Sequence, residues 1–195
     1  MAESTESAAP ASNAPSDVLL ALYMGDRDKA KALAADTPLT LPELAAFGDL
    51  SHVSEYVSKY PERLHDYSPD GWTALHLAAF MGYASVVVRL LRAGASTSAS
   101  SRNQQGNTAL HAALAGRREM PVITALLAAG SNADTADAQS YRPLHLSASR
   151  GDQAASELLM ACGATTSATT AEGKTAADFA SDRGHPDLAD WLVRH

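Results

Sequence analysis

Cysteine is almost missing from this chain of 195 residues, because Cys162 is the only one. A single thiol cannot form a disulfide within the chain, so we expect a protein of the reducing cytoplasm. Cys162 closes the apolar stretch 158–161, with no positive residue or helix start beside it in the sequence. We therefore expect a partly buried structural thiol and not a reactive one.

Long apolar runs and targeting signals are missing as well. No stretch approaches the roughly 18 apolar residues that a membrane-spanning helix needs. Residues 1–17 lack the positive start and apolar centre of a secretory signal, and residue 2 is not the glycine that myristoylation requires. These absences predict a cytoplasmic protein that does not enter a membrane.

Positive charge is in deficit, with 15 lysines and arginines against 22 acidic residues and a net charge of −7. Without a basic stripe, neither nucleic acid nor an anionic membrane surface is an expected partner. Hydrophobic residues make up 46% of the chain but aromatic residues only 6%, and alanine is common. This composition favours thin helices packed in close layers over one large globular core.

What the sequence does contain is a repeated motif. The segment Thr73–Ala79 reads Thr-Ala-Leu-His-Leu-Ala-Ala, and three related segments follow it: Thr108–Ala113, Arg142–Ala148 and, in altered form, Thr175–Ala180. The position of the histidine recurs after 35, 34 and 33 residues, as His76, His111, His145 and Asp178. A period of about 33 residues predicts a solenoid of stacked helix pairs.

Glycines mark the expected turn between the two helices of each pair. They stand at Gly25, Gly48, Gly82, Gly116, Gly151 and Gly184. Glycine tolerates a positive φ, which the chain needs where a helix stops and reverses. Before the first full motif, we expect four helices, with Ser16 capping the first: 17–24, 28–35, 43–47 and 52–59.

The motif resembles the ankyrin repeat, whose signature is Thr-Pro-Leu-His-x-Ala, and the chain is similar to small freestanding ankyrin proteins of bacteria. The resemblance implies an all-α solenoid of stacked antiparallel helix pairs, joined by short β-hairpin or loop fingers. It also implies a non-enzymatic protein-interaction module, an adaptor, scaffold or inhibitor. The Thr and His of the motif would then hydrogen-bond to the backbones of adjacent loops, although Arg142 replaces the threonine before His145.

The domain division follows from the spacing. We expect a disordered tail at residues 1–15, which is poor in apolar residues, and a single repeat domain at 16–195. The glycine spacing is only 23 residues in the first unit, which predicts a helix-only N-terminal cap at 16–37 as unit one. The remaining units are four repeats and a C-terminal capping repeat: 38–65, 66–98, 99–134, 135–167 and 168–195.

No cofactor or metal is expected. Histidines spaced one repeat apart cannot converge on one ion, whose ligands must lie within about 2.1 Å of it. The sequence contains no nucleophile elbow, phosphate-binding glycine loop or zinc-ligand spacing, so we expect no enzyme.

The expected binding surface is the concave groove, which in the family that the chain resembles is lined by finger tips and the ends of the first helices. Carried over position by position, the candidates are Tyr67, Asp70, Trp72, Phe80, Met81, Arg102, Gln104, Gln105, Asn107, Tyr141, Ser149 and Arg150. Aromatic residues, Met and Arg often anchor interfaces. We expect one contiguous site with an apolar centre at Trp72 and Phe80 and an Arg/Gln rim.

Three classes of function stay open: a monomer that grips an unidentified partner protein, a self-associating structural protein that uses the same patch, and an enzyme or small-ligand-binding protein. A further alternative is that Trp72 and Phe80 only pack on neighbouring elements. We expect the monomeric protein-binding module.

Overall fold

A computed structural model of the chain describes residues 14–35, 37–116 and 119–195, so residues 1–13 of the expected tail lie outside it. The described residues form six pairs of α-helices and one short 3-10 helix, η1 (Pro61–Arg63). The pairs are α1 (Asp17–Tyr23) and α2 (Arg27–Ala34), α3 (Leu41–Phe47) and α4 (Leu50–Lys59), α5 (Ala74–Met81) and α6 (Ala84–Arg92), α7 (Ala109–Ala115) and α8 (Met120–Ala128), α9 (Pro143–Ser149) and α10 (Gln153–Ala161), and α11 (Ala176–Asp182) and α12 (Pro186–Arg194).

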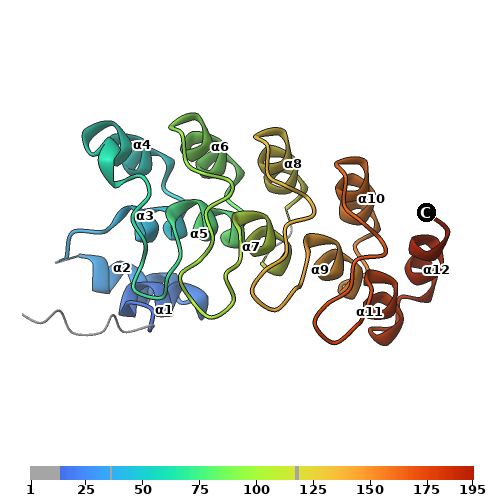
Figure 1. Ribbon diagram of the computed structural model, residues 1–195. Coiled ribbons are helices and arrows are strands. Elements are labelled where there is room, and N and C mark those ends of the chain that lie inside the picture. The colour runs from blue at the N-terminus through green and yellow to red at the C-terminus, as the bar shows by residue number, and fades with distance from the viewer. Residues whose placement is uncertain (1–13, 36, 117–118) are drawn as a thin grey trace, which may run out of the picture.

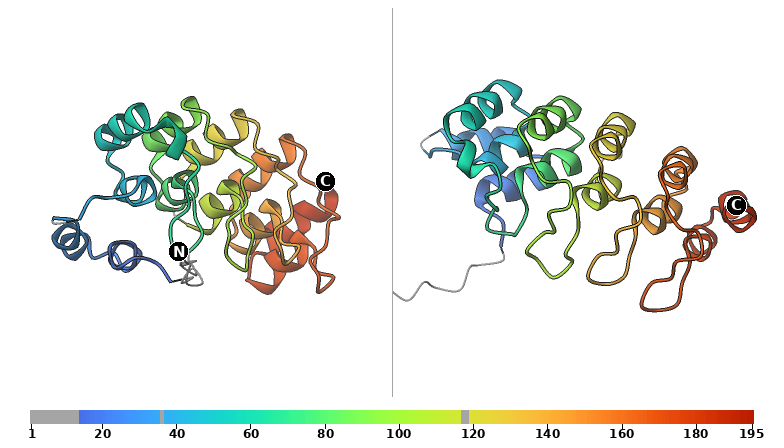
Figure 2. Two further views of the ribbon diagram at one scale, coloured as in Figure 1. Left: turned by 60° about the vertical axis from the view of Figure 1, so that its left-hand side comes forward. Right: turned by 45° about the horizontal axis from the view of Figure 1, so that its top comes forward.

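The helices form two rows, which confirms the expected all-α solenoid. Helices α3, α5, α7, α9 and α11 form the inner row, α4, α6, α8, α10 and α12 form the outer row, and the finger loops project on the side of the inner row (Figure 1). Figure 2 shows the fingers side by side. Among the described residues, the only β-bridge is an isolated one between Tyr67 and Thr73. The fingers are therefore loops and not hairpins of regular strands.

Helix starts are set by side-chain caps. The hydroxyl of Ser16 accepts a hydrogen bond from the Leu19 amide at 3.3 Å, which confirms Ser16 as the cap of α1. Helix α3 begins at Leu41, two residues before the predicted start. Thr40 and Glu43 form a capping box there, with the Thr40 amide donating to the Glu43 carboxylate at 2.9 Å. The sequence pattern Thr-x-x-Glu could have located this start.

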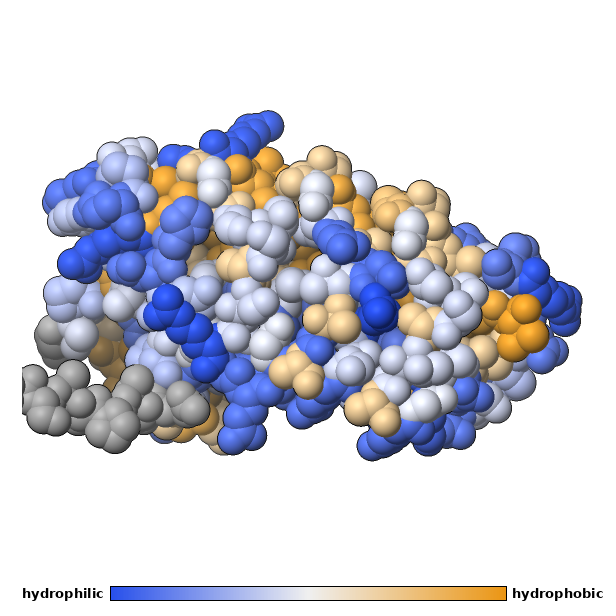
Figure 3. Space-filling view, viewed as in Figure 1, coloured by the Kyte–Doolittle hydropathy of each residue, from blue (hydrophilic) through white to orange (hydrophobic). Residues whose placement is uncertain are grey.

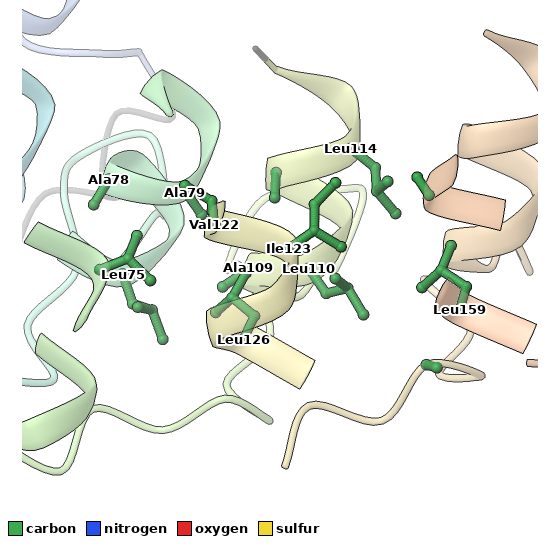
Figure 4. Close-up of a cluster of buried hydrophobic side chains, with 14 of the residues drawn as sticks. Leu75, Ala78, Ala79, Ala109, Leu110, Leu114, Val122, Ile123, Leu126 and Leu159 are labelled. Carbon is green, nitrogen blue, oxygen red and sulfur yellow. The ribbon is translucent and has the colours of Figure 1, made fainter. Parts of the chain in front are cut away.

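The core runs through the stack between the two rows. Small side chains on the inner helices, such as Ala78 and Ala113, are fully buried, which lets neighbouring pairs approach closely. Larger residues of the outer helices fill the layer, as Val122, Ile123 and Leu126 do from α8 (Figure 4). Burying such a side chain contributes roughly 1.5–3 kcal/mol, so hydrophobic packing across the repeats holds the stack together.

Two sequence-based expectations are wrong. Gly116 has a φ of −85° and so lacks the positive φ of the other turn glycines, and a Cβ atom added to it would lie 2.0 Å from the Phe80 carbonyl oxygen. Cys162 is exposed, because it follows the end of α10 and faces away from the core.

In the space-filling view, hydrophobic side chains gather over α6 and α8 (Figure 3).

Candidate protein-binding groove

A ladder of buried histidines connects the fingers beneath the groove. The Nε2 atom of His76 lies 2.8 Å from the carbonyl oxygen of Asn107, and that of His111 lies 3.1 Å from the carbonyl oxygen of Tyr141. A carbonyl can only accept, so each Nε2 carries the proton and each Nδ1 accepts from the threonine hydroxyl of its own motif, at 2.7 and 2.8 Å. The histidines therefore bond to the next finger as expected, whereas each threonine hydroxyl bonds to the histidine of its own motif.

The third rung differs in its partner but not in its geometry. The Nδ1 atom of His145 accepts a hydrogen bond from the Arg142 amide at 2.9 Å, and Nε2 donates to the carbonyl oxygen of Ala168 at 3.0 Å. A backbone amide thus replaces the missing threonine hydroxyl. The Arg142 guanidinium instead pairs with the carboxylate of Asp134 at 2.9 Å.

Burial lowers the pKa of all three histidines. The effect is largest for His76, whose pKa falls from 6.5 to about 4 because its ring is desolvated. Desolvation also lowers the pKa of His111 and His145. All three rings are therefore neutral at pH 7.

Carboxylates occupy the histidine position at both ends of the ladder. Asp178 accepts from the amide and the hydroxyl of Thr175, at 2.8 and 2.7 Å, and these bonds lower its pKa. At the other end Glu43 accepts from the Ser16 hydroxyl at 2.6 Å, which ties the start of α1 to α3. A carboxylate suits both positions because it can satisfy its own capping site without donating to a further finger.

The chemistry of the inner row changes along the stack. Trp72, just before the cap of α5, has its ring centroid 5.9 Å from that of Phe80, so the two lie on one face of the helix. The corresponding pair in the last unit is Lys174 and Asp182, which form an ion pair at 2.7 Å. The groove is thus aromatic in its N-terminal half and charged at its C-terminal end.

Helix α1 covers part of the aromatic half. The Tyr23 ring stands edge-on to Phe80 with centroids 6.2 Å apart, and its hydroxyl donates to the Asp70 carboxylate at 2.7 Å. Burial is the largest cause that raises the pKa of Tyr23, and the hydrogen bond to Asp70 is the second. From α2, Arg27 donates to the hydroxyl of Tyr83 at 2.6 Å and to the carbonyl oxygen of Phe47 at 2.8 Å. The first helix pair therefore packs on the groove side of α3 and α5.

Two hollows remain beside this contact, and they share Asp70 and Trp72. One, of about 170 Å³, is also lined by Tyr23, Leu77 and Phe80, and is almost wholly apolar apart from Asp70. The second, of about 340 Å³, is bordered by the amide side chains of the next finger, Asn103, Gln104 and Gln105. A larger hollow of about 610 Å³ lies between α2 and the α3–α4 pair, and none of the predicted site residues lines it.

The structure sorts the twelve predicted residues by exposure. Exposed residues are Arg102, Gln104, Gln105 and Arg150, and half-buried residues are Tyr67, Trp72, Phe80, Tyr141 and Ser149. Buried residues are Asp70, Met81 and Asn107. Met81 packs in the cluster that α1 forms with α5, and Asn107 receives the His76 hydrogen bond, so these two serve the scaffold and not the surface.

Only part of the predicted set comes together. Asp70, Trp72, Phe80, Gln104 and Gln105 line the two hollows. Nearby, the Arg102 guanidinium lies 3.9 Å from the centroid of the Tyr67 ring, a cation–π contact between adjacent fingers. The remaining surface candidates belong to the next unit along: Tyr141, Ser149 and Arg150.

Tyr141 belongs to a second aromatic cluster that the sequence did not predict. Its ring lies 5.4 Å from that of Phe179 on α11, and Lys174 lies 5.9 Å from the same phenylalanine ring. Phe179 takes the position that Leu77 has in the third unit. The sequence did not predict the contact between Tyr23 and Asp70 either. These residues lie 47 positions apart, a distance that the repeat spacing does not indicate.

Replacing Tyr23 with phenylalanine tests how firmly α1 is docked. The change leaves the ring in place and removes the hydroxyl that donates to Asp70, so we expect the free energy of unfolding to fall by roughly 1–3 kcal/mol. Urea denaturation measures it. Tyr60→Phe serves as the control, because Tyr60 is 36% exposed. Equal stability of the two variants would contradict a stabilising contact between Tyr23 and Asp70.

Neither a metal centre nor a membrane span is apparent in the described part of the chain. Among residues 14–35, 37–116 and 119–195, no three His, Cys, Asp or Glu side chains gather as metal ligands would. None of the helices in these ranges combines the length and the hydrophobicity needed to cross a bilayer.

Comparison with known proteins places these features in a family context. A family model described as "Ankyrin repeats (3 copies)" matches residues 43–137 and again residues 117–195. The chain is 37% identical over 97 residues to the RelA-associated inhibitor of Mus musculus, which covers 48% of this chain and 12% of that protein. It is 35% identical over 126 residues to ankyrin repeat and SOCS box protein 16 of Mus musculus, covering 61% and 27%.

A third relative is the probable 26S proteasome regulatory subunit p28 of Saccharomyces cerevisiae. It is 34% identical over 134 residues, which cover 67% of this chain and 58% of the yeast protein. The chain thus spans from about an eighth to rather more than half of the length of these three relatives.

Proposed function

Because the chain belongs to the ankyrin-repeat family, we propose that it is a non-enzymatic protein-interaction module that binds a partner protein through its concave groove and finger tips. Two of its relatives are named as an inhibitor and as a regulatory subunit, which supports a binding role and not a catalytic one. The partner segment lies along the inner helices and is anchored in the third and fourth units.

The observation that carries this proposal is the pair of hollows that share Trp72. The first offers an apolar pocket, and the second offers amide side chains that can bond to a peptide backbone. Interfaces of ordinary proteins combine these two features, with an apolar centre and a polar rim. The exposed Arg102, Gln104 and Gln105 continue the rim along the finger at residues 95–107.

We further propose that the chain acts as a monomer in the cytoplasm, without a cofactor and without nucleic acid. The net charge of −7 disfavours nucleic acid, and the two nitrogens of each ladder histidine are already taken by protein groups. The bacterial source that the motif suggests stays a prediction, because the three relatives named above are from mouse and yeast.

Self-association is the second candidate, and one observation favours it. Leu20, Met24 and Leu33 are 46%, 76% and 36% exposed on the outward side of α1 and α2, and they border one hollow. Sedimentation equilibrium distinguishes the two, because a monomer has a mass of 20.3 kDa at every concentration.

Truncation of Trp72 tests the groove. Once a partner has been isolated from a lysate of the native host and purified, Trp72→Ala is expected to weaken its binding by about 2 kcal/mol or more, since buried aromatic anchors dominate interfaces. Isothermal titration calorimetry gives the affinities.

The matched control is Trp191→Ala, which truncates the same half-buried residue type at the far end of the stack. Circular dichroism must show that both variants are folded. Equal affinities of the two variants would mean that the partner binds elsewhere, for example at the hollow between α2 and the α3–α4 pair, and that Trp72 is only a packing residue.

A further inference from the structure

A buried carboxylate lies at the junction of the two hollows. Asp70 is only 8% exposed, and it lines both. One of its oxygens accepts from the Tyr23 hydroxyl at 2.7 Å and the other accepts from the Ser68 hydroxyl at 2.6 Å. Two hydroxyl donors on different elements hold the carboxylate in a fixed orientation. Each oxygen keeps acceptor capacity for a further donor.

Within the described ranges 14–35, 37–116 and 119–195, no cationic side chain forms an ion pair with this carboxylate. None of the ion pairs found among the described residues includes Asp70. Arg102, on the neighbouring finger, is held over the Tyr67 ring instead. A buried negative charge is costly unless it is paired, so the hollow favours a positive group from outside the chain.

The other walls of the larger hollow suit one kind of cation. The Trp72 side chain borders it, and an indole is the aromatic group that attracts cations most strongly. Gln104 and Gln105 add amide oxygens that can accept hydrogen bonds, whereas the Asn103 amide oxygen already accepts from the Ser101 hydroxyl at 2.8 Å and from the Gln105 backbone amide at 3.1 Å. A guanidinium group can stack on an aromatic ring while its N–H groups reach a carboxylate and amides, whereas an ammonium is a point charge.

The other fingers do not repeat this combination. The residue three positions before the N-cap of each inner helix is Asp70 before α5, and the equivalent residues before α7, α9 and α11 are Gln105, Gln139 and Glu172. Glu172 is exposed, and it is followed by Lys174 instead of an aromatic residue. The pairing of a buried carboxylate with tryptophan is therefore specific to the first of these fingers.

We propose that the hollow between Asp70, Trp72 and the Asn103–Gln105 amides binds an arginine side chain of the partner, while an apolar side chain next to that arginine fills the pocket of Tyr23, Leu77 and Phe80. This inference rests on the proposed function and specifies the partner segment: a stretch with an arginine beside a large aliphatic residue. The net charge of −7 favours the approach of such a basic segment.

Short peptides test the inference without the natural partner. The probes are acetyl-Leu-Arg-amide and acetyl-Leu-Gly-Arg-amide, each with matched versions in which lysine or citrulline replaces arginine. Citrulline keeps the size and most of the hydrogen-bonding groups of arginine but is neutral. Binding is followed by the fluorescence of Trp72 in the full-length Trp191→Phe variant, where Trp72 is the single tryptophan.

We expect at least one arginine peptide to bind weakly but saturably, and its citrulline version to bind about tenfold more weakly or worse, because a charge-assisted hydrogen bond is lost. Asp70→Asn, added to the same background, should weaken the arginine peptide by a similar factor and leave the citrulline peptide unchanged. Glu172→Gln is the matched control, since it removes one negative charge at the same position of the last finger and should change nothing.

The comparison of arginine with citrulline needs no change at Asp70, so the test holds even if Asp70→Asn destabilises the docking of α1. The arginine site would be overturned if the citrulline peptides or the lysine peptides bound as tightly as the arginine peptides. It would also be overturned if no probe showed saturable binding. The proposed function stands or falls separately, on the Trp72→Ala measurement with the whole partner.

Discussion

Acidification from pH 7 to about pH 4.5 is expected to lower the free energy of unfolding by roughly 2–3 kcal/mol through His76 alone. The pKa of His76 is about 4 in the folded protein, against 6.5 for an ordinary histidine. The unfolded chain therefore binds a proton below pH 6.5 that the folded chain does not accept until near pH 4. Stability contributed by the neutral ring is complete above pH 6.5 and is lost as the pH falls through this window.

The other two rungs of the ladder act in the same direction. Burial lowers the pKa of His111 and of His145, so both add to the loss at acid pH. Carboxylates with a lowered pKa, such as Asp178, stay ionised down to below their usual value of 3.8. The interval above about pH 4.5 therefore reports chiefly on the histidines.

Urea denaturation at a series of pH values measures the effect. The variant His76→Gln keeps an amide N–H for the Asn107 carbonyl but cannot be protonated, so it should be less stable at pH 7 and should lose less stability between pH 6.5 and 4.5. His65→Gln is the control, since His65 is exposed. A wild type equally stable at both ends of the interval, or an unchanged pH dependence in His76→Gln, would contradict the ladder as the acid-sensitive element.

Replacing Gly116 with alanine is expected to destabilise the protein by about 3 kcal/mol or more, because the close contact involves the main chain and not a movable side chain. A Cβ atom at this position would lie 2.0 Å from the Phe80 carbonyl oxygen. Relieving that clash requires the end of α5 and the turn after α7 to separate. The same shift would move Phe80 in the aromatic half of the groove.

The matched control is Gly130→Ala. Gly130 has a φ of +88°, but a Cβ atom added there would have nothing within 4 Å, so its substitution incurs only the strain of a left-handed backbone, about 1–2 kcal/mol. Chemical denaturation of both variants separates steric overlap from backbone strain. A smaller loss for Gly116→Ala than for Gly130→Ala would show that the turn relaxes around the added methyl group.

Much of the architecture follows from local sequence. Ser16 starts α1 as expected, because a cap requires only that a hydroxyl and an amide lie a few residues apart. The period near 33 residues identified the stacked pairs and the histidine ladder. Each pair contacts mainly its immediate neighbours, so a repeating sequence is enough to specify a repeating structure.

The composition of the groove follows only in part. Trp72 and Phe80 could be placed on one helix face from their spacing of eight residues, and their rings are in contact. Burial of Met81 and Asn107 could not be predicted in the same way. Met81 is covered by a helix more than fifty residues earlier in the chain, and Asn107 lies where a histidine 31 residues away reaches its carbonyl group.

The sequence alone determined the repeat fold, the cap of α1 and the contacts of the motif histidines with the next finger, because these depend on local spacing. Only the tertiary structure decided that α1 packs on the groove side, that Tyr23 and Ser68 orient the Asp70 carboxylate, and that Asp70 shares two hollows with Trp72. The first helix pair lies outside the 33-residue register. No periodicity therefore specifies its packing, which is set by how Leu19, Leu22 and Tyr23 fit against side chains distant in the chain.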